Sequence, residues 1–488
     1  MADNAKGMSR RAFTAAAGSI ALLAGAAPRR SWAADKQADV IVIGGGMAGL
    51  SAALTLEDSG LKVLIVEADN RLGGRCFTLR TQDGSFDCGA TTIGPLYGRV
   101  RAFADQAGVA LKAPPGRDKF SYHINGGFVH PSAWEGSAYN KTQGAERAML
   151  PERLEFPTVL RHNKIDDILE WASAESLRYD VPLDIFLSQN GVSDEAIRLI
   201  GLTSNVMSLS ETSALFQMRE FVRLALPQSG DRKREVYAAG KDGQYHYVKN
   251  GTSALIDGMA GLLKAEPMLN APVKAIDVSD GTAAVTLLDG KVLRAGSVIC
   301  TAPFSALRNI DIRPLPEAKK RVAIQTAAYT LTTHVFFVPT KPYWEADGHP
   351  AGLISDDVVE RVMANYDDNG NVTWIDVWLN GTAAETADKM SEADRIAMVQ
   401  SRLETLRPSM KGAIRPVGSY SWGNKPYIQG NKYVMRPGEA ASLFPYLAEP
   451  HAGRLFFAGE HTRNHEAGLE AAAATGIREA VNVLERFG

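Results

Sequence analysis

A glycine-rich turn joins a short apolar segment to a helical segment near the start of the chain. Residues 40–43 read Val-Ile-Val-Ile, which is typical of a strand buried in a parallel sheet. Gly44, Gly46 and Gly49 follow with the spacing G-x-G-x-x-G, and residues 51–57 continue as a helix rich in Ala and Leu. A strand, a glycine turn and a helix in this order predict the first half of a βαβ unit that binds a dinucleotide.

The second half of the unit follows directly. Gly60 stops the helix, and residues 62–66 form a second apolar strand that ends at Glu67. In such a unit the first glycine permits the tight turn, the second lets the backbone approach a pyrophosphate, and the third lets the helix lie close to the strand. The N–H groups at the start of the helix favour the phosphates. An acid about 20 residues further on, here Glu67, accepts hydrogen bonds from the adenosine ribose.

The residues that follow indicate which dinucleotide is bound. Residues 67–75 read E-A-D-N-R-L-G-G-R and resemble the E-A-x-x-R-x-G-G-R signature of the flavin-containing amine oxidases, whose cofactor is FAD. This signature includes Ala68 and the turn at Gly74. The turn can place the guanidinium of Arg75 on the pyrophosphate, where a bidentate contact is favourable.

Weaker blocks in the middle of the chain resemble the same family. Residues 87–95 resemble the segment that passes along the flavin, residues 250–255 a helix start, and residues 298–303 a strand end. Residues 270–276 resemble the strand near the adenine, with Val273 at the position whose backbone holds this base. In the flavin segment the resemblance assigns cofactor contacts to Gly89, Ala90, Thr91 and Thr92.

A second specific block lies near the C-terminus. Residues 456–462 read F-F-A-G-E-H-T and lead into an Ala-rich helix, closely resembling polyamine oxidases and histone demethylases. By this resemblance Glu460, after Gly459, contacts the ribityl–phosphate part of FAD. Leu469, after Gly468, offers its backbone N–H to the N1/C2=O edge of the flavin, where a donor stabilises the charge of the reduced ring. An ordinary amphipathic helix would explain the alanines but not the Gly-Glu-His-Thr turn.

The resemblance predicts an α/β fold in two parts. A Rossmann-like FAD-binding domain is built from the discontinuous segments 36–115, 240–310 and 420–488, and an α+β substrate-binding domain from 116–239 and 311–419. Within the second domain, 3–4 spacing of apolar residues predicts helices, and alternating or continuous apolar runs predict strands. The helices are expected over 160–226, and the strands over 326–338 and 371–379.

Three residues are expected to act on the substrate: His334, Trp422 and Tyr433. Many family members have a lysine that holds a water near flavin N5, about ten residues before a tryptophan. Counting back from Trp344 gives His334, which could hold the same water, although a histidine merely packed on the strand is the alternative. Trp422 matches the first aromatic residue that flanks the amine. The second falls on Lys432, and a one-residue insertion would restore Tyr433.

Two further departures concern the cofactor and the substrate. No cysteine occurs at 430–433, where monoamine oxidases attach flavin covalently, so non-covalent FAD is expected. Amino-acid oxidases of the venom type carry an arginine that binds the substrate carboxylate, and the aligned position here is Thr92. This favours a small-molecule amine over an α-amino acid, although another arginine could serve. Amine oxidation by flavin needs no metal ion and no protein nucleophile.

Three functions fit these patterns. The first is FAD-dependent oxidation of an amine to an imine, which hydrolyses to an aldehyde or ketone while electrons pass to oxygen or a periplasmic carrier. The second is a related flavoprotein that oxidises C–C bonds, as carotenoid desaturases do. The third is a non-catalytic FAD-binding protein, which the missing lysine keeps open. The F-A-G-E-H-T block and Trp422 favour the first. The amine, the acceptor and the oligomeric state are left open.

The first 33 residues read as an export signal. Arg10 and Arg11 precede an Ala- and Gly-rich run, and Ser31 and Ala33 fit the small positions before a cleavage site. The Ser-Arg-Arg-x-Phe start resembles the twin-arginine signal, whose route carries folded, cofactor-loaded proteins. A bacterial, periplasmic protein and a transient contact with the twin-arginine machinery are therefore expected. A flexible basic N-terminus is the alternative.

Composition excludes other partners. The formal net charge is −2, so the chain lacks the excess of positive charge that is typical of nucleic-acid-binding proteins. Three cysteines, Cys76, Cys88 and Cys300, are too few and too scattered for a disulfide framework or a zinc site. No apolar run reaches the roughly 18–20 residues that a membrane-spanning helix needs.

Overall fold

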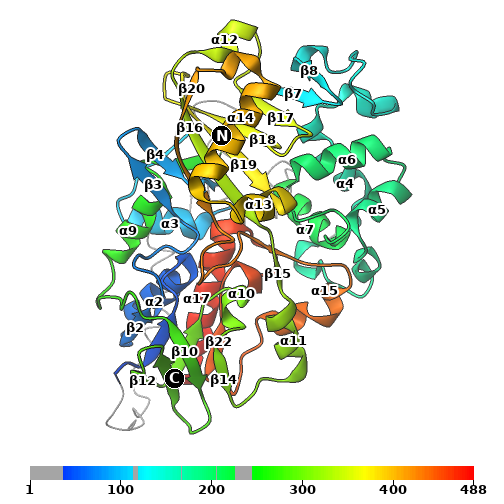
Figure 1. Ribbon diagram of the computed structural model, residues 1–488. Helices are drawn as coiled ribbons and strands as arrows, with labels where there is room; N and C mark the ends of the chain where they lie inside the picture. The colour runs from blue at the N-terminus through cyan, green and yellow to red at the C-terminus, as the bar shows by residue number, and fades with distance from the viewer. Residues whose placement is uncertain (1–36, 114–118, 166, 205, 226–244, 488) are drawn as a thin grey trace, which may run out of the picture.

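The computed structural model describes residues 37–113, 119–165, 167–204, 206–225 and 245–487 (Figure 1). The expected export signal and the expected domain boundary at residues 115 and 116 lie outside these ranges. The chain forms a mixed α/β fold, which confirms the fold class expected from the sequence.

A four-stranded parallel sheet lies in the lower half of the molecule in Figure 1. Its order is β2-β1-β13-β22, with β1 at Val40–Ile43, β2 at Val63–Val66, β13 at Ser297–Cys300 and β22 at Leu455–Phe457. Every residue of β1 is buried, as expected for a strand with neighbours on both sides and helices over the sheet. Strands from three distant parts of the sequence therefore meet in one sheet.

Two helices cross closely over this sheet. α2 (Met47–Asp58) follows β1, and α17 (Gly468–Phe487) follows β22. A Cβ added at Gly476 would lie 2.2 Å from the carbonyl oxygen of Ala48, so the two backbones are in contact at that point. α2 and α17 share a buried apolar cluster with β1 and with α3 (Gly98–Gln106). Two helices that are far apart in the sequence, α2 and α17, are thus packed into one core.

A second four-stranded sheet lies beside the first, in the order β12-β11-β10-β14. Its strands are β10 (Val273–Asp277), β11 (Ala283–Leu287), β12 (Val292–Ala295) and β14 (Asp311–Arg313). β14 pairs in parallel with β10. The domain boundary expected between residues 310 and 311 therefore falls inside a sheet.

A seven-stranded sheet dominates the upper half of Figure 1, in the order β20-β16-β19-β18-β17-β7-β8. One face of it packs against α13 (Gly381–Asp388) and α14 (Glu392–Leu406) through a wholly apolar cluster. The side chain of Ser391 caps α14 by accepting a hydrogen bond from the Asp394 N–H. The strands are β7 (Phe120–Ile124), β8 (Gly127–Val129), β16 (Thr332–Pro339), β17 (Gly352–Ser355), β18 (Arg361–Tyr366), β19 (Val372–Asn380) and β20 (Ile414–Ser421).

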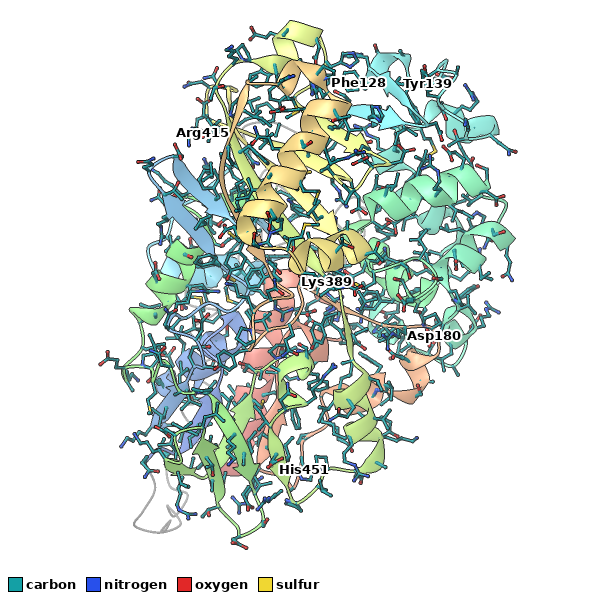
Figure 2. All side chains as sticks on the ribbon, viewed as in Figure 1. Phe128, Tyr139, Asp180, Lys389, Arg415 and His451 are labelled. Atoms are coloured by element: carbon teal, nitrogen blue, oxygen red, sulfur yellow. The ribbon has the colours of Figure 1, made fainter. Side chains whose placement is uncertain are left out.

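A helical lobe covers one side of the large sheet. It contains α4 (Glu155–His162), α5 (Leu183–Gln189), α6 (Asp194–Thr203) and α7 (Ala214–Ala225), joined by short 3₁₀ turns. Asp180, labelled in Figure 2, links this lobe to the C-terminal part of the chain. Its carboxylate accepts hydrogen bonds from the Ser213 hydroxyl at 2.6 Å and from the Ala440 N–H at 2.8 Å.

Short elements complete the fold. Among the described residues, no helix combines the length and the apolar character needed to cross a membrane. The remaining strands are β3 (Thr78–Thr81), β4 (Gly84–Asp87), β5 (Thr92–Ile93), β6 (Leu111–Lys112), β9 (His246–Val248), β15 (Ala328–Tyr329) and β21 (Tyr433–Val434), and the remaining helices of four residues or more include α9 (Thr252–Ala260), α10 (Phe304–Leu307), α11 (Ala318–Thr326), α12 (Tyr343–Asp347), α15 (Glu439–Ser442) and α16 (Phe444–Leu447).

Candidate functional site

A cavity of about 750 Å³ begins at the carboxyl ends of β1 and β2 and extends to the large sheet. Gly44 and Glu67 line one end of it, and Trp378 and Lys432 also line it. Ligands of open parallel sheets bind outside the carboxyl ends of the strands, where the connecting helices begin. The cavity therefore lies where the glycine turn was expected to hold a dinucleotide.

Two helices begin at this cavity. Gly46, Met47 and Ala48 at the start of α2 line it, as do Gly468 and Leu469 at the start of α17. The first backbone N–H groups of a helix have no partner within the helix and carry a partial positive charge. Two such ends on one cavity provide donors for the phosphates and carbonyl groups of a flavin dinucleotide.

The three glycines of the turn differ in backbone conformation and in how much space a side chain would have at each position. Gly44 has a φ of +98°, which side chains with a Cβ rarely adopt. A Cβ at Gly49 would lie 1.9 Å from the Gly44 carbonyl oxygen, so only glycine lets α2 lie this close to β1. A Cβ at Gly46 would meet no atom nearer than 3.9 Å, and this backbone faces the cavity. These environments match the roles of tight turn, close packing and close approach to a ligand.

Glu67 lies at the end of β2 and lines the cavity. One carboxylate oxygen accepts a hydrogen bond from the Gly45 N–H at 2.6 Å, and the other accepts one from the Asp69 N–H at 2.8 Å. These bonds fix the carboxylate beside the glycine turn. Burial raises the pKa of Glu67, and the two backbone N–H groups oppose this effect. Its oxygens retain lone pairs that can accept from the hydroxyl groups of a ribose.

Glu460 joins the C-terminal block to the signature near the N-terminus. Its Oε1 lies 2.8 Å from Nη1 of Arg75 and accepts a hydrogen bond from the Tyr433 N–H at 2.9 Å. Burial would raise the pKa of this carboxyl, but Arg75, Arg463 and other charges lower it to about 2, so Glu460 is ionised near neutral pH. Its Oε2 is buried without a hydrogen-bond partner, and Glu460 lines the cavity. A buried acceptor of this kind fits a hydroxyl donor of FAD.

The structure brings most of the expected cofactor-binding residues to the cavity. Thr91, Thr92 and Gly49 are the exceptions. Thr92 lies in β5 and pairs with Tyr247, and Gly49 packs against Gly44 as described above. The expected residues that line the cavity are Gly44, Gly46, Ala48, Glu67, Ala68, Gly74, Arg75, Gly89, Ala90, Val273, Gly459, Glu460, Gly468 and Leu469.

Trp422 supports the cavity from behind. It is fully buried, its indole N–H donates to the Cys88 carbonyl, and it is absent from the cavity wall. A Cβ at Gly89 would lie 2.8 Å from its ring, so Trp422 packs directly on the segment that lines the cavity. Trp422 was expected to flank the substrate. In the structure it instead contacts the backbone of Cys88 and Gly89.

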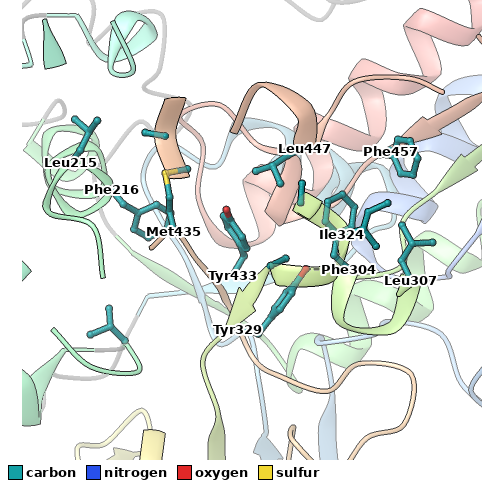
Figure 3. Packing of buried hydrophobic residues seen from close by; sticks show 14 of the residues in the cluster. Leu215, Phe216, Phe304, Leu307, Ile324, Tyr329, Tyr433, Met435, Leu447 and Phe457 are labelled. Atoms are coloured by element: carbon teal, nitrogen blue, oxygen red, sulfur yellow. Dashed lines mark hydrogen bonds between the residues drawn. The ribbon is translucent and has the colours of Figure 1, made fainter. Parts of the chain in front are cut away.

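Tyr433 also lies elsewhere than expected. Figure 3 shows it packed in the apolar core beside Tyr329, Phe216 and Met435, and its side chain does not line the cavity. Its ring centroid is 6.0 Å from that of Tyr329. Lys432 lines the cavity instead. Neighbouring residues of an extended segment point to opposite sides, so only one of the two can face the ligand.

Sequence reasoning missed Trp378 in the wall on the large sheet, and it missed Asp376, which holds the Trp378 ring from behind. Trp378 lines the cavity, and its indole N–H donates to Asp376. Nδ1 of His334 lies 3.0 Å from the same carboxylate, and the His334 and Trp378 rings meet edge to face at 5.2 Å. His334 is 2% exposed and contacts the wall through Trp378. The signal was present in β19, where Trp374, Asp376 and Trp378 alternate with apolar residues.

His461 is a buried histidine next to Glu460, and its protonation is expected to be unfavourable in the folded protein. Its ring is 1% exposed, both ring nitrogens lack a hydrogen-bond partner, and it packs against Phe304. Burial lowers the pKa of His461 to about 3, although Glu460 opposes this effect. The neutral form is therefore the one that the fold accepts.

A falling pH should accordingly destabilise the protein through His461. The folded-state pKa of His461 is below the ordinary histidine pKa of about 6.5, so between about pH 6.5 and 3 the unfolded chain binds a proton that the folded chain does not. The stabilising effect is complete above pH 6.5 and is lost as the pH falls through this window, by roughly 2–4 kcal/mol. We expect His461→Phe to flatten the decrease in Tm between pH 7 and 5. An equally steep decrease in the variant would assign the acid sensitivity to other groups.

The described ranges contain no group of three or more His, Cys, Asp or Glu side chains placed to hold a metal ion. The three cysteines are buried and unpaired. The chemistry of the cavity is therefore built from backbone N–H groups, the Glu67 and Glu460 carboxylates, and aromatic and cationic side chains. This donor set fits FAD.

Known proteins resemble the chain over almost its full length. The family model of flavin containing amine oxidoreductases matches residues 47–484. An L-amino-acid oxidase of Siganus canaliculatus is 27% identical over 470 residues, covering 91% of this chain and 85% of that protein. The human flavin-containing amine oxidase B is 23% identical over 464 residues, covering 92% of this chain and 86% of that protein. A double mutant of putrescine oxidase has a similar fold, with a TM-score of 0.73 and 20% sequence identity. The match covers 93% of this chain and 100% of that chain.

Proposed function

Since the chain belongs to the family of flavin-containing amine oxidoreductases, it is an FAD-dependent enzyme, and we propose that it oxidises a small amine to an imine. Hydrolysis of the imine then gives an aldehyde or a ketone. The observation that supports this most directly is the single cavity that joins the dinucleotide cradle to the wall at Trp378. Electrons leave to oxygen or to a periplasmic carrier.

FAD supplies, when bound, the two-electron acceptor that amine oxidation requires. The starts of α2 and α17, together with Glu67, Arg75 and Glu460, would hold it. Cys76, Cys88 and Cys300 are buried, and of these only Cys76 lines the cavity. Residues 430–433 contain no cysteine. We therefore propose that FAD binds without a covalent link.

The side chains around the reacting amine have separate tasks. Trp378 shapes the wall and, with its indole held by Asp376, cannot rotate freely. Lys432 contributes a cationic head. The apolar part of the wall excludes water, which strengthens electrostatic interactions inside the cavity and protects the reaction from side products. The four-stranded parallel sheet would carry the cofactor, while the seven-stranded sheet and the helical lobe would carry the substrate.

Anaerobic mixing of the purified holoenzyme with a panel of amines tests this function. Loss of the oxidised flavin absorbance with an amine supports it, and admission of air then shows whether oxygen or another acceptor restores the colour. Bleaching by precursors of unsaturated products alone would assign the protein to C–C oxidation. A protein that stays colourless after reconstitution with FAD would refute the proposal.

His334→Ala is expected to slow flavin reduction while FAD is retained. The substitution leaves Asp376 with Trp378 as its remaining side-chain partner, so the orientation of the wall is loosened without a change in the dinucleotide cradle. We expect a roughly 10-fold decrease in the reduction rate, which corresponds to a rise of about 1.4 kcal/mol in the activation free energy, because the wall is oriented less precisely. Stopped-flow absorbance measures the rate, and the visible spectrum measures the FAD content. Unchanged kinetics would remove His334 from the site.

Export through the twin-arginine route belongs to the same proposal. The pair Arg10–Arg11 and the small residues Ser31 and Ala33 support it. We expect the enzyme in the periplasmic fraction of a bacterial host, shortened to a start near Ala34. Replacing both arginines by lysine should leave a full-length, FAD-loaded protein in the cytoplasm. Periplasmic protein from that variant would contradict the route.

A further inference from the structure

A second cavity, of about 260 Å³, shares no lining residue with the cofactor cavity. Four parts of the chain form its wall: the connection between α6 and α7, the helix α10, the strand β15 with its flanking residues, and the segment 429–436. Its charged lining residues are two arginines, Arg308 and Arg436, and one acid, Glu211. The cavity therefore contains an excess of positive charge.

The two arginines are held beside each other at the end of α11. Nη2 of Arg308 donates to the Ala327 carbonyl at 3.0 Å, and Nη1 of Arg436 donates to the Thr326 carbonyl at 3.3 Å. These carbonyls belong to consecutive residues, so the two guanidinium groups lie close together. Cations are favourable at the C-terminus of a helix, and this explains one bond from each arginine.

The two guanidinium groups retain donors that the fold does not use. Nε of Arg308 donates to the Phe304 carbonyl, which leaves its Nη1, and Arg436 keeps both Nε and Nη2. Among the described residues, neither arginine forms an ion pair with a carboxylate. Glu211 instead accepts a hydrogen bond from the Ser208 hydroxyl. Neighbouring cations repel each other, so an anion between them would be stabilising.

A two-stranded ribbon separates this cavity from the cofactor cavity. β15 pairs with β21, and Figure 3 shows Tyr329 of the first strand beside Tyr433 of the second. Tyr329 and Val434 line the second cavity, whereas Thr330 and Lys432 line the cofactor cavity. Tyr329 and Thr330 face different cavities because successive residues of an extended segment point to opposite sides. The ribbon is therefore a wall that both cavities share.

The same ribbon is bound to the ion pair of the cofactor site. Nη1 of Arg75 donates to the Asn431 carbonyl at 2.7 Å, and the Tyr433 N–H donates to Oε1 of Glu460 at 2.9 Å. Arg75 and Glu460 both line the cofactor cavity. The segment that they hold continues directly to Val434 in the wall of the second cavity. A ligand that orders this segment from the second cavity would also order the pair that holds FAD.

We propose that the second cavity binds a small phosphate-bearing anion between Arg308 and Arg436, and that its occupation tightens the hold of the protein on FAD. A phosphate group carries close to two negative charges near neutral pH and has several strong acceptor oxygens. Both properties match two arginines with unused donors, since arginine binds phosphate through paired, charge-assisted hydrogen bonds. The site is independent of which amine is oxidised.

Titration calorimetry of the FAD-loaded enzyme with inorganic phosphate tests the site, with sodium chloride of equal ionic strength as the reference. FAD fills the other cavity, so the added ion cannot bind where its pyrophosphate lies. We expect saturable binding of phosphate to a single site per chain, and a higher Tm in phosphate than in chloride. Absence of saturable binding would refute the site.

A phosphate ester distinguishes the two sources of such an anion. Tighter binding of glycerol 3-phosphate than of inorganic phosphate would assign the site to a phosphorylated metabolite. Equal or weaker binding of the ester would assign it to free phosphate.

Substitutions locate the site. Arg308→Met and Arg436→Met should each weaken phosphate binding roughly 10- to 100-fold, because each removes a charge-assisted contact. Arg436 is exposed and makes one side-chain hydrogen bond to the fold, so its variant should remain folded. Arg321→Met is the matched control, because Arg321 lies in α11, donates to the Pro316 carbonyl and lines neither cavity. Wild-type phosphate affinity in Arg436→Met would overturn the proposal.

Glu211→Gln should shift the affinity in the opposite direction. The substitution removes the negative charge from the cavity wall and should strengthen phosphate binding roughly 2- to 3-fold, a small effect because Glu211 is exposed and its charge is screened. Weaker binding in this variant would contradict an anion at this position.

The release of FAD measures the coupling between the two cavities. We expect FAD to leave the wild-type enzyme roughly 5-fold more slowly in phosphate than in chloride of equal ionic strength. The two salts should give the same release rate from Arg436→Met. Flavin fluorescence follows the release and needs no substrate. Equal rates from the wild-type enzyme in the two salts would overturn the coupling.

Discussion

Replacing Gly49 by alanine is expected to abolish FAD binding and to lower the stability of the protein. The new Cβ would lie 1.9 Å from the carbonyl oxygen of Gly44, and this contact joins backbone to backbone, so no side chain can move aside. α2 must shift away from β1, which withdraws the N–H groups at Gly46 and Met47 from the cavity. Overpacking of this severity costs about 3 kcal/mol. Flavin absorbance per protein measures the cofactor, and thermal unfolding measures the stability.

Gly136→Ala is the matched control for this prediction. A Cβ at Gly136 would meet no atom within 4 Å, and its φ lies outside the left-handed region, so the same chemical change should leave FAD content and Tm unaltered. If Gly49→Ala purified with a full complement of FAD and an unchanged Tm, the close approach of α2 to β1 would not be needed to hold the cofactor.

Glu460→Ala is expected to have the second largest effect. It removes the charge partner of Arg75 and one acceptor that the cavity offers to the cofactor. Removing one member of a buried ion pair leaves the other charge uncompensated, which costs about 2–3 kcal/mol here because the Arg75 side chain is still 23% exposed. We expect weaker FAD retention on gel filtration and a lower Tm.

Two further variants separate charge from shape. Glu460→Gln keeps an acceptor for the Tyr433 N–H but loses the negative charge, and should fall between wild type and Glu460→Ala. The double variant Arg75→Met with Glu460→Met removes both charges and should recover part of the stability, but not the FAD retention. If the double variant bound FAD as tightly as wild type, the pair would have only a structural role.

The local parts of the cofactor site could be predicted from the sequence because each depends on neighbours along the chain. The glycine turn, the strand before it and the acid after it are set by φ angles and apolar runs within thirty residues, and the structure places Gly44, Gly46 and Glu67 at the cavity. FAD as the cofactor is confirmed by the family. The pairing of Arg75 with Glu460 joins positions 385 residues apart, and no spacing rule reaches that far.

The substrate side was harder to predict because it depends on which face of a sheet meets the cavity. The alternation in residues 371–379 predicted a strand, and β19 occupies Val372–Asn380. The same pattern could not show whether Trp378 or its apolar neighbours face a ligand, since that depends on where α13 and α14 pack. At Lys432 and Tyr433, one residue of register exchanges a cation for an aromatic ring.

The helical lobe shows a different limit. Apolar residues at 3–4 spacing over 165–171 predicted that this stretch is helical, but its described residues form only a 3₁₀ turn, at Ile168–Glu170. The Asp167 side chain accepts a hydrogen bond from the Leu169 N–H, and it thereby caps a short turn instead of extending a helix. Periodicity indicates which residues are buried, and local side-chain bonds decide the length of the element.

The order of the parallel sheet has a consequence for biosynthesis. β22 and α17 come from the last 34 residues of the chain, yet they complete the cradle begun by β1. A nascent polypeptide that has not yet been synthesised as far as α17 lacks this closing strand and helix, so the complete cradle can hold the coenzyme only after this part of the chain has been made. Early ribosomal release of a shortened product would give an apoprotein with an open sheet edge, and an unpaired edge of this kind is prone to aggregation.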